Sequence, residues 1–132
     1  MMETPMDRID KILNHDLFLY HLGRNNAAEA DRRFCRHSMV HFLDVARIGT
    51  IIALEEGLKI NREWIYAAAL LHDCGKHEQY EMGTPHEQAS ARIAPEILKT
   101  CGFNDEETGV IVTAISRHRD PEAAKEKNLN GI

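Results

Sequence analysis

Four of the eight histidines in this chain of 132 residues fall on apolar stripes of four different expected helices. They are His41, His72, His86 and His118. A buried imidazole needs a partner for its ring nitrogens, and one metal ion can satisfy several rings at once. Imidazole nitrogen suits Mn, Fe, Co, Ni and Zn, so this pattern predicts a centre that holds a divalent transition metal.

The adjacent His72 and Asp73 are the sharpest feature of the sequence. Neighbouring helical residues point about 100° apart, because a turn holds about 3.6 residues. A long imidazole and a short carboxylate can still converge on a cation beside a helix end. A site of histidine and carboxylate without thiolate indicates a catalytic rather than a structural metal.

The three cysteines, Cys35, Cys74 and Cys101, are widely spaced and form no CxxC pair. This spacing argues against a disulfide scaffold and a cysteine zinc site, and it favours a reducing cytoplasm.

Periodicity predicts an all-α, compact bundle of five to six helices, and no alternating strand pattern occurs. The expected helices cover residues 6–22, 27–55, 61–73, 84–100 and 104–118, with a further start at Asp120-Pro121. One domain, residues 1–132, is expected from the length. Because the last helix shows no apolar face before Ile132, we expect the natural protein to continue.

Local signals position these helices. Asn61 is an expected N-cap, Thr84 is expected to cap a helix with Pro85 at its first position, and Asn104 with Glu107 matches a capping box. In the second helix, the stripe expected to be buried is Phe34, His37, His41, Val45, Ile48 and Ile52. Gly23 is expected to end the first helix, and residues after Lys76, including Glu78, Tyr80 and Glu81, are expected in a loop.

The composition excludes several classes of protein. Hydrophobic residues make up 43%, and the net charge is -5. These values argue against intrinsic disorder and against a basic face that binds a nucleic-acid duplex. The longest strongly apolar run, residues 64–71, is far shorter than the roughly 20 residues that span a membrane. We expect a cytoplasmic protein that binds neither a nucleic-acid duplex nor a membrane.

Residues 67–76, AAALLHDCGK, resemble the signature AALLHDxGK of the HD-domain superfamily of metal-dependent phosphohydrolases. His41, followed by Val45 and Ala46, resembles the family's first histidine motif, H-x-x-x-V-A. The resemblance covers residues 34–118 and implies an all-helical, small stand-alone HD protein. It implies that His41, His72 and Asp73 bind a metal, together with a later aspartate.

In HD proteins with two metals, the aspartate of the doublet bridges them and two further histidines bind the second ion. His86 and His118 resemble those histidines in order and helix placement. Asp120 is the available candidate for the family's late aspartate, but its position before Pro121 is that of an N-cap. The alternative is that this ligand lies beyond Ile132.

The reaction implied by the resemblance is phosphoester hydrolysis by metal-activated water. Asp73 would bind metal and accept a proton, and Lys76 would contact phosphate or simply be solvated. Arg117 or Arg119 would offset substrate charge. A nucleotide or other small phosphorylated substrate is expected.

Several alternatives stay open. His37, four residues before His41, orients that ligand or packs in the core. The same histidines also suit an HD-type di-iron oxygenase, or a degenerate HD domain that binds metal or ligand without catalysis. A plain helical bundle with incidental histidines is the simplest alternative. The amphipathic first helix is compatible with a homo-oligomer.

Overall fold

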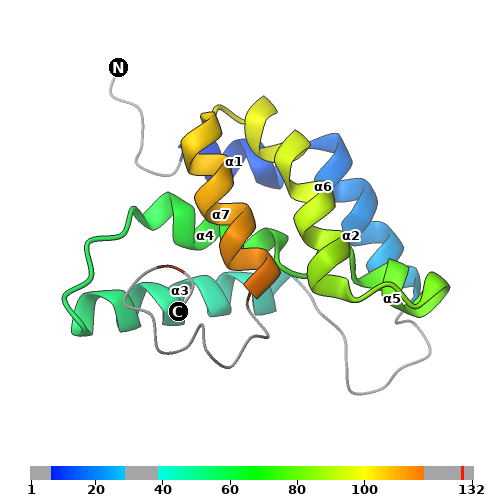
Figure 1. Ribbon diagram of the computed structural model, residues 1–132, viewed down its shortest axis with the longest axis horizontal. Coiled ribbons are helices and arrows are strands. Elements are labelled where there is room, and N and C mark those ends of the chain that lie inside the picture. Colours follow the sequence, from blue (N-terminus) through cyan, green and yellow to red (C-terminus); the bar gives the residue numbers. More distant parts are fainter. Residues whose placement is uncertain (1–6, 29–38, 118–128, 130–132) are drawn as a thin grey trace.

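Seven α-helices make up most of the computed structural model, which describes residues 7–28, 39–117 and 129 (Figure 1). They are α1 (Asp7–Leu13), α2 (Asp16–Ala28), α3 (Met39–Glu55), α4 (Arg62–Leu71), α5 (Lys76–Met82), α6 (His86–Thr100) and α7 (Asp105–Arg117). No strand occurs in these residues, so the predicted all-α bundle is confirmed. Within the same residues, no helix is both long and apolar enough to cross a membrane.

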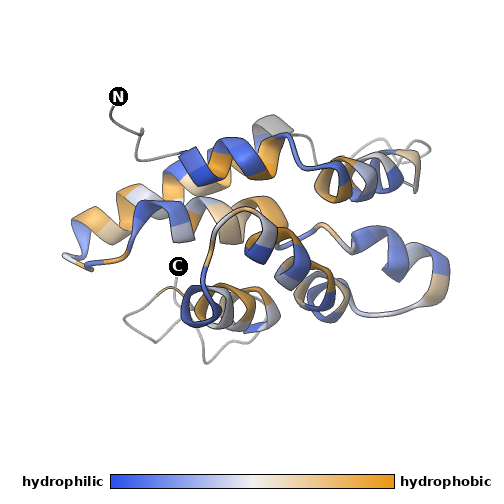
Figure 2. Ribbon diagram, turned by 90° about the horizontal axis from the view of Figure 1, so that it is seen from above, coloured by the Kyte–Doolittle hydropathy of each residue, from blue (hydrophilic) through white to orange (hydrophobic). Residues whose placement is uncertain are grey.

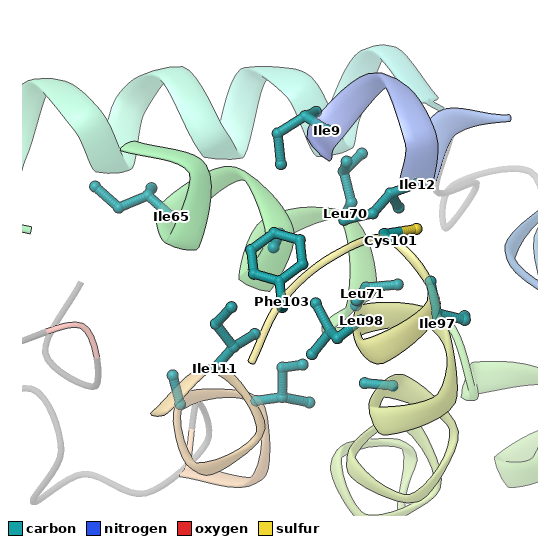
Figure 3. Close-up of a cluster of buried hydrophobic side chains, with 14 of the residues drawn as sticks. Ile9, Ile12, Ile65, Leu70, Leu71, Ile97, Leu98, Cys101, Phe103 and Ile111 are labelled. Atoms are coloured by element: carbon teal, nitrogen blue, oxygen red, sulfur yellow. The ribbon is translucent and has the colours of Figure 1, made fainter. Parts of the chain in front are cut away.

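Helix α4 lies at the centre of the bundle and packs against α3, α7 and α1. Helices α6 and α7 lie side by side, and α5 packs against α2 and α6 (Figure 1). Each helix carries both hydrophobic and hydrophilic segments (Figure 2), as expected for helices that bury one face. The buried side chains of α1, α4, α6 and α7 converge around Phe103 (Figure 3).

Two predicted helix starts are confirmed by their cap geometry. The side chain of Asn61 accepts a hydrogen bond of 2.8 Å from the backbone N–H of Glu63. At the start of α7, Asn104 Oδ1 accepts from the N–H of Glu107 at 2.8 Å, while Glu107 Oε1 accepts from the N–H of Asn104 at 3.2 Å. These reciprocal bonds form the predicted capping box.

Residues 6–22 do not form the single helix that was predicted, and Gly23 lies inside α2 rather than at a helix end. The chain breaks between α1 and α2 because His15 Nδ1 accepts a hydrogen bond of 3.1 Å from the N–H of Leu17. A side chain that satisfies a free N–H in the first turn starts a new helix at this point.

The predicted buried stripe of α3 is wrong in the described residues. His41 is exposed and Ile48 is 57% exposed, whereas Phe42, Ala46 and Ala53 are buried. Both stripes have helical spacing, so periodicity alone cannot choose between them. The packing of α3 on α4 selects the stripe that begins at Phe42. Phe34 and His37 lie outside the described residues.

The region between α4 and α6 also differs from the prediction. Helix α4 ends at Leu71, residues 72–75 form a turn, and α5 begins at Lys76. Residues 78–81 are therefore helical, and the predicted loop containing Glu78, Tyr80 and Glu81 is absent. Thr84 does not cap α6; Pro85 is the N-cap residue and contributes no side-chain hydrogen bond. Gly83, with φ of 76°, supplies the left-handed conformation that ends α5.

Candidate metal centre

The His72–Asp73 doublet lies in the short turn between α4 and α5. The N–H of His72 still donates to Ala68 O at 2.9 Å, so His72 caps the end of α4. The N–H of Lys76 then donates to Asp73 O at 3.0 Å and closes the turn. Asp73 is only 4% exposed, so its carboxylate lies inside the protein rather than in solvent.

Side chains from two other helices hold this turn. Asn25 of α2 donates from Nδ2 to Asp73 O at 2.9 Å, and its Oδ1 accepts from the N–H of His77 at 2.8 Å. Ser90 Oγ of α6 accepts from the N–H of Gly75 at 2.9 Å. These bonds satisfy the buried N–H groups of Gly75 and His77, and they give Asp73 O a second donor beside the N–H of Lys76.

Glycine is required at position 75 because α6 passes directly against the turn. A Cβ atom at Gly75 would lie 2.7 Å from the backbone carbon and the Cβ of Ala89, and 2.7 Å from the N of Ser90. Gly75 therefore permits the close approach of the turn to α6, which also carries His86.

The imidazole of His72 is oriented by its own helix. Its Nδ1 lies 2.5 Å from Ala69 O, and its Nε2 lies 3.4 Å from Asp73 Oδ2. The ring of Phe42, from α3, packs edge-on against the His72 ring with centroids 5.8 Å apart. Contacts from α3 and α4 thus fix the direction in which Nε2 points.

His86, the first residue of α6, approaches the other oxygen of the same carboxylate. Its Nε2 lies 3.4 Å from Asp73 Oδ1, while its Nδ1 lies 2.8 Å from Gln79 Oε1. His86 is 5% exposed, so both partners of this contact are buried. The structure therefore brings together three of the predicted metal ligands, His72, Asp73 and His86.

The hydrogen bond at His72 Nδ1 determines whether Nε2 of the same ring presents a lone pair or a proton to Asp73. A backbone carbonyl such as Ala69 O only accepts, so His72 Nδ1 must carry a proton. Nε2 of a neutral ring then directs a lone pair at the carboxylate oxygen 3.4 Å away, which is unfavourable unless positive charge lies between them. Either a proton on Nε2 or a cation supplies that charge. The donor chemistry of this group, imidazole Nε2 and carboxylate, fits a divalent transition metal.

The described residues do not complete a ligand set. Across residues 7–28, 39–117 and 129, no group of three or more His, Cys, Asp or Glu side chains is arranged closely enough to hold a metal ion. Although both rings approach Asp73, their 3.4 Å distances are those of loose polar contacts.

The other predicted site residues are distributed around this group. His41 is exposed at the start of α3, and its ring lies 6.0 Å from that of Phe42, the residue that packs on His72. Lys76 begins α5, directly after the turn, and Arg117 ends α7; both are half-buried. The predicted roles of His37, His118, Arg119 and Asp120 fall outside the described residues.

Cys74 lies next to Asp73 but is not suited to bind the metal. Burial raises the pKa of its thiol to about 12, and its Sγ donates to Ser90 O at 3.9 Å. A thiol that stays protonated is a poor metal ligand, because the thiolate is the binding form. This agrees with the prediction of a centre made of histidine and carboxylate.

Spacing in the sequence did not reveal Asn25 or Gln79, because both reach the site across helix–helix contacts. It also did not reveal a second histidine pair, in which His21 Nδ1 lies 2.8 Å from His77 Nε2. Burial, and then the neighbouring His77, lower the pKa of His21. This contact between the two rings joins α2 to α5.

Comparisons with known proteins agree with this arrangement. Residues 39–131 match the HD domain family, a span that includes all five predicted metal ligands. The chain is also 52% identical, over 115 residues, to an uncharacterized protein of Clostridium beijerinckii, and the match covers 87% of this chain and 73% of the relative. No solved structure matches the chain significantly. The match over most of the chain, with the His-Asp doublet in the turn after α4, shows that this protein belongs to the HD domain family.

Proposed function

We propose that this protein is a metal-dependent phosphohydrolase that acts on a nucleotide or another small phosphoester. Membership in the HD domain family supports hydrolysis as the class of reaction. The observation that carries the proposal is the direction of two imidazoles: Nε2 of His72 and Nε2 of His86 each lie 3.4 Å from one oxygen of the buried Asp73 carboxylate.

His72, Asp73 and His86 would hold the metal, with His41 and His118 as the further proposed ligands. When bound, one or two ions of Mn, Fe, Co, Ni or Zn would supply Lewis acidity that activates water and offsets phosphate charge. Asp73 would also accept a proton at a carboxylate oxygen. Lys76, three residues after Asp73 in the turn, would offer its ammonium group to a phosphate oxygen.

The surrounding residues prepare this group before substrate arrives. Ala69 O and Gln79 Oε1 orient the two rings, and Asn25 and Ser90 hold the turn that carries Asp73. Such supporting contacts commonly change metal affinity or activity 10- to 100-fold when they are removed. The burial of Asp73 also strengthens its electrostatic interaction with any bound cation, because water is excluded.

Elemental mass spectrometry tests the proposal on protein purified without chelator. Wild type is expected to carry one or two equivalents of transition metal, and Asp73→Asn and His72→Ala are expected to lose it. His15→Ala is a matched control, because His15 contacts Thr100 at the far end of α6 from His86, about 20 Å along the helix. It should keep the metal.

Metal-loaded protein is then assayed with p-nitrophenyl phosphate and with nucleoside monophosphates. Hydrolysis by wild type and the His15→Ala control, lost in Asp73→Asn, supports the proposal. Two bound irons with oxygen consumption would favour the oxygenase instead. Folded wild type that takes up none of Mn, Fe, Co, Ni or Zn would leave a domain that keeps the family's fold without its chemistry.

A further inference from the structure

Gln79 makes two hydrogen bonds to the same residue through one oxygen atom. Its Oε1 accepts from the backbone N–H of His86 at 3.0 Å and lies 2.8 Å from the ring Nδ1 of His86. Gln79 is on α5 and His86 begins α6, so this contact crosses the turn at Gly83. One side chain therefore contacts both the backbone and the ring of a proposed metal ligand.

The backbone contact determines which atom of the Gln79 amide faces His86. A backbone N–H can only donate, so the atom 3.0 Å from it must be the amide oxygen rather than the amide nitrogen. The same oxygen faces the ring Nδ1, which must therefore carry the proton of a neutral imidazole. The lone pair of a neutral ring is then left on Nε2, 3.4 Å from Asp73 Oδ1, a repulsion that the 2.8 Å bond to Gln79 must outweigh in the metal-free protein.

Without Gln79 we expect the favoured arrangement of His86 to reverse, because the buried Asp73 carboxylate lies 3.4 Å from Nε2, whereas the more exposed Glu87 carboxylate lies 3.7 Å from Nδ1. The neutral imidazole of histidine prefers in water to carry its proton on Nε2, and here the carboxylate of Asp73 lies beside Nε2 as an acceptor. The ring would donate from Nε2 to Asp73, and its lone pair would point from Nδ1 toward α5. His86 would then present an N–H, which cannot bind a cation, to the metal centre.

We propose that Gln79 is a positioning residue that holds the proton of His86 on Nδ1 and so keeps Nε2 available as a ligand. The proposal rests on the proposed function for its consequence, metal binding, but the position of the proton is a property of the metal-free protein. Gln79 is well placed for this role because its helix is held to both of its neighbours. The N–H of His77 donates to Asn25 of α2, and Arg92 of α6 pairs with Glu78.

Three variants separate this role from a general effect on folding. Gln79→Met keeps the length of the side chain and removes the acceptor. Gln79→Glu keeps an oxygen that can accept from both the N–H and Nδ1 of His86. Gln88→Met is the matched control, since Gln88 is exposed on the first turn of α6. Circular dichroism and thermal unfolding establish that each variant is folded.

Long-range ¹H–¹⁵N spectra of the metal-free protein report which ring nitrogen of His86 is protonated, at a pH where the ring is neutral. Wild type, Gln79→Glu and Gln88→Met are expected to carry the proton on Nδ1, and Gln79→Met on Nε2. Zinc titration against a competing chelator is expected to show about 10- to 100-fold weaker binding for Gln79→Met, with rescue in Gln79→Glu.

The spectrum of wild type is decisive even if Gln79→Met does not fold, because a proton on Nε2 of His86 in wild type would overturn the proposal. A folded Gln79→Met protein that keeps the proton on Nδ1 would overturn it as well. If the proton moves as expected but wild type binds no zinc or other transition metal, the proposed function fails while the positioning role of Gln79 stands.

Discussion

Asn25 Nδ2 donates a hydrogen bond of 2.9 Å to the backbone carbonyl of Asp73, and so joins α2 to the turn that carries the His72–Asp73 doublet. Asn25 lies outside residues 39–131, the span that matches the HD domain family. It is 1% exposed, and its Oδ1 accepts from the N–H of His77 on the other side of the turn. The N-terminal helices of this protein therefore support a site that lies within the family match.

Asn25→Ala is expected to destabilise the protein and weaken metal binding together. The change removes the partner of the buried N–H of His77, a loss that costs about 1–3 kcal/mol. It also removes one of the two donors to Asp73 O, which keeps the N–H of Lys76. Urea unfolding measures the free energy, and zinc titration measures the affinity. Asn26→Ala, at the exposed neighbouring position, is the control. Equal stability of the two variants would contradict the role of Asn25.

Gly75→Ala is expected to lower the free energy of unfolding by about 1–3 kcal/mol, because the added Cβ would press on the backbone of α6. The forced separation should also move His86 away from Asp73 and weaken metal binding. Gly109→Ala is a control for which the opposite change in stability is expected. A Cβ at Gly109, in α7, meets nothing within 4 Å, so alanine there should raise stability by about 1 kcal/mol. Thermal unfolding that shows the same sign for both changes would refute the close approach at Gly75.

Phe42→Ala and Ile48→Ala test which stripe of α3 is buried. Phe42 is 1% exposed, so its truncation is expected to cost about 3–5 kcal/mol. Ile48 lies on the solvent side, so its truncation should change stability by less than about 1 kcal/mol. Chemical denaturation compares the two. A larger loss for Ile48→Ala would mean that α3 buries the stripe predicted from the sequence instead.

Protonation of Glu107 is expected to lower the free energy of unfolding at acid pH. Arg8, at 2.8 Å, and then Trp64 and the N–H of Asn104, hold the pKa of this carboxyl at about 2, below its ordinary value of 4.5. Because the folded-state pKa is the lower one, the charged Glu107 stabilises the folded protein fully above pH 4.5. That contribution is lost as the pH falls from 4.5 to about 2.

The Glu107→Gln variant isolates this effect. At pH 7 it should be about 1–3 kcal/mol less stable than wild type, since it loses charge-assisted hydrogen bonds. The difference should shrink as the pH falls below 4.5. Glu106→Gln, at an exposed position in the same turn, is the control and should follow wild type. A difference from wild type that stays constant down to pH 2 would rule out titration of Glu107 as its cause.

The sequence alone determined the features that depend on neighbours along the chain. The caps at Asn61 and Asn104 were predictable because a capping side chain bonds an N–H two or three residues away. The position of the His72–Asp73 doublet after a helix was also predictable, because it follows the helical run directly along the chain. The surrounding motif indicated the HD domain family that the comparison shows.

The tertiary structure decided every feature that depends on contacts between helices. Two stripes of α3 have the same period, and only packing on α4 selects Phe42 over Ile48. No local pattern placed Gln79 against His86 or Asn25 against Asp73, because those contacts form only when α5 and α2 take their places beside the turn. Helical spacing is a local property, whereas the direction of a buried polar side chain is set by whichever distant group satisfies its hydrogen bonds.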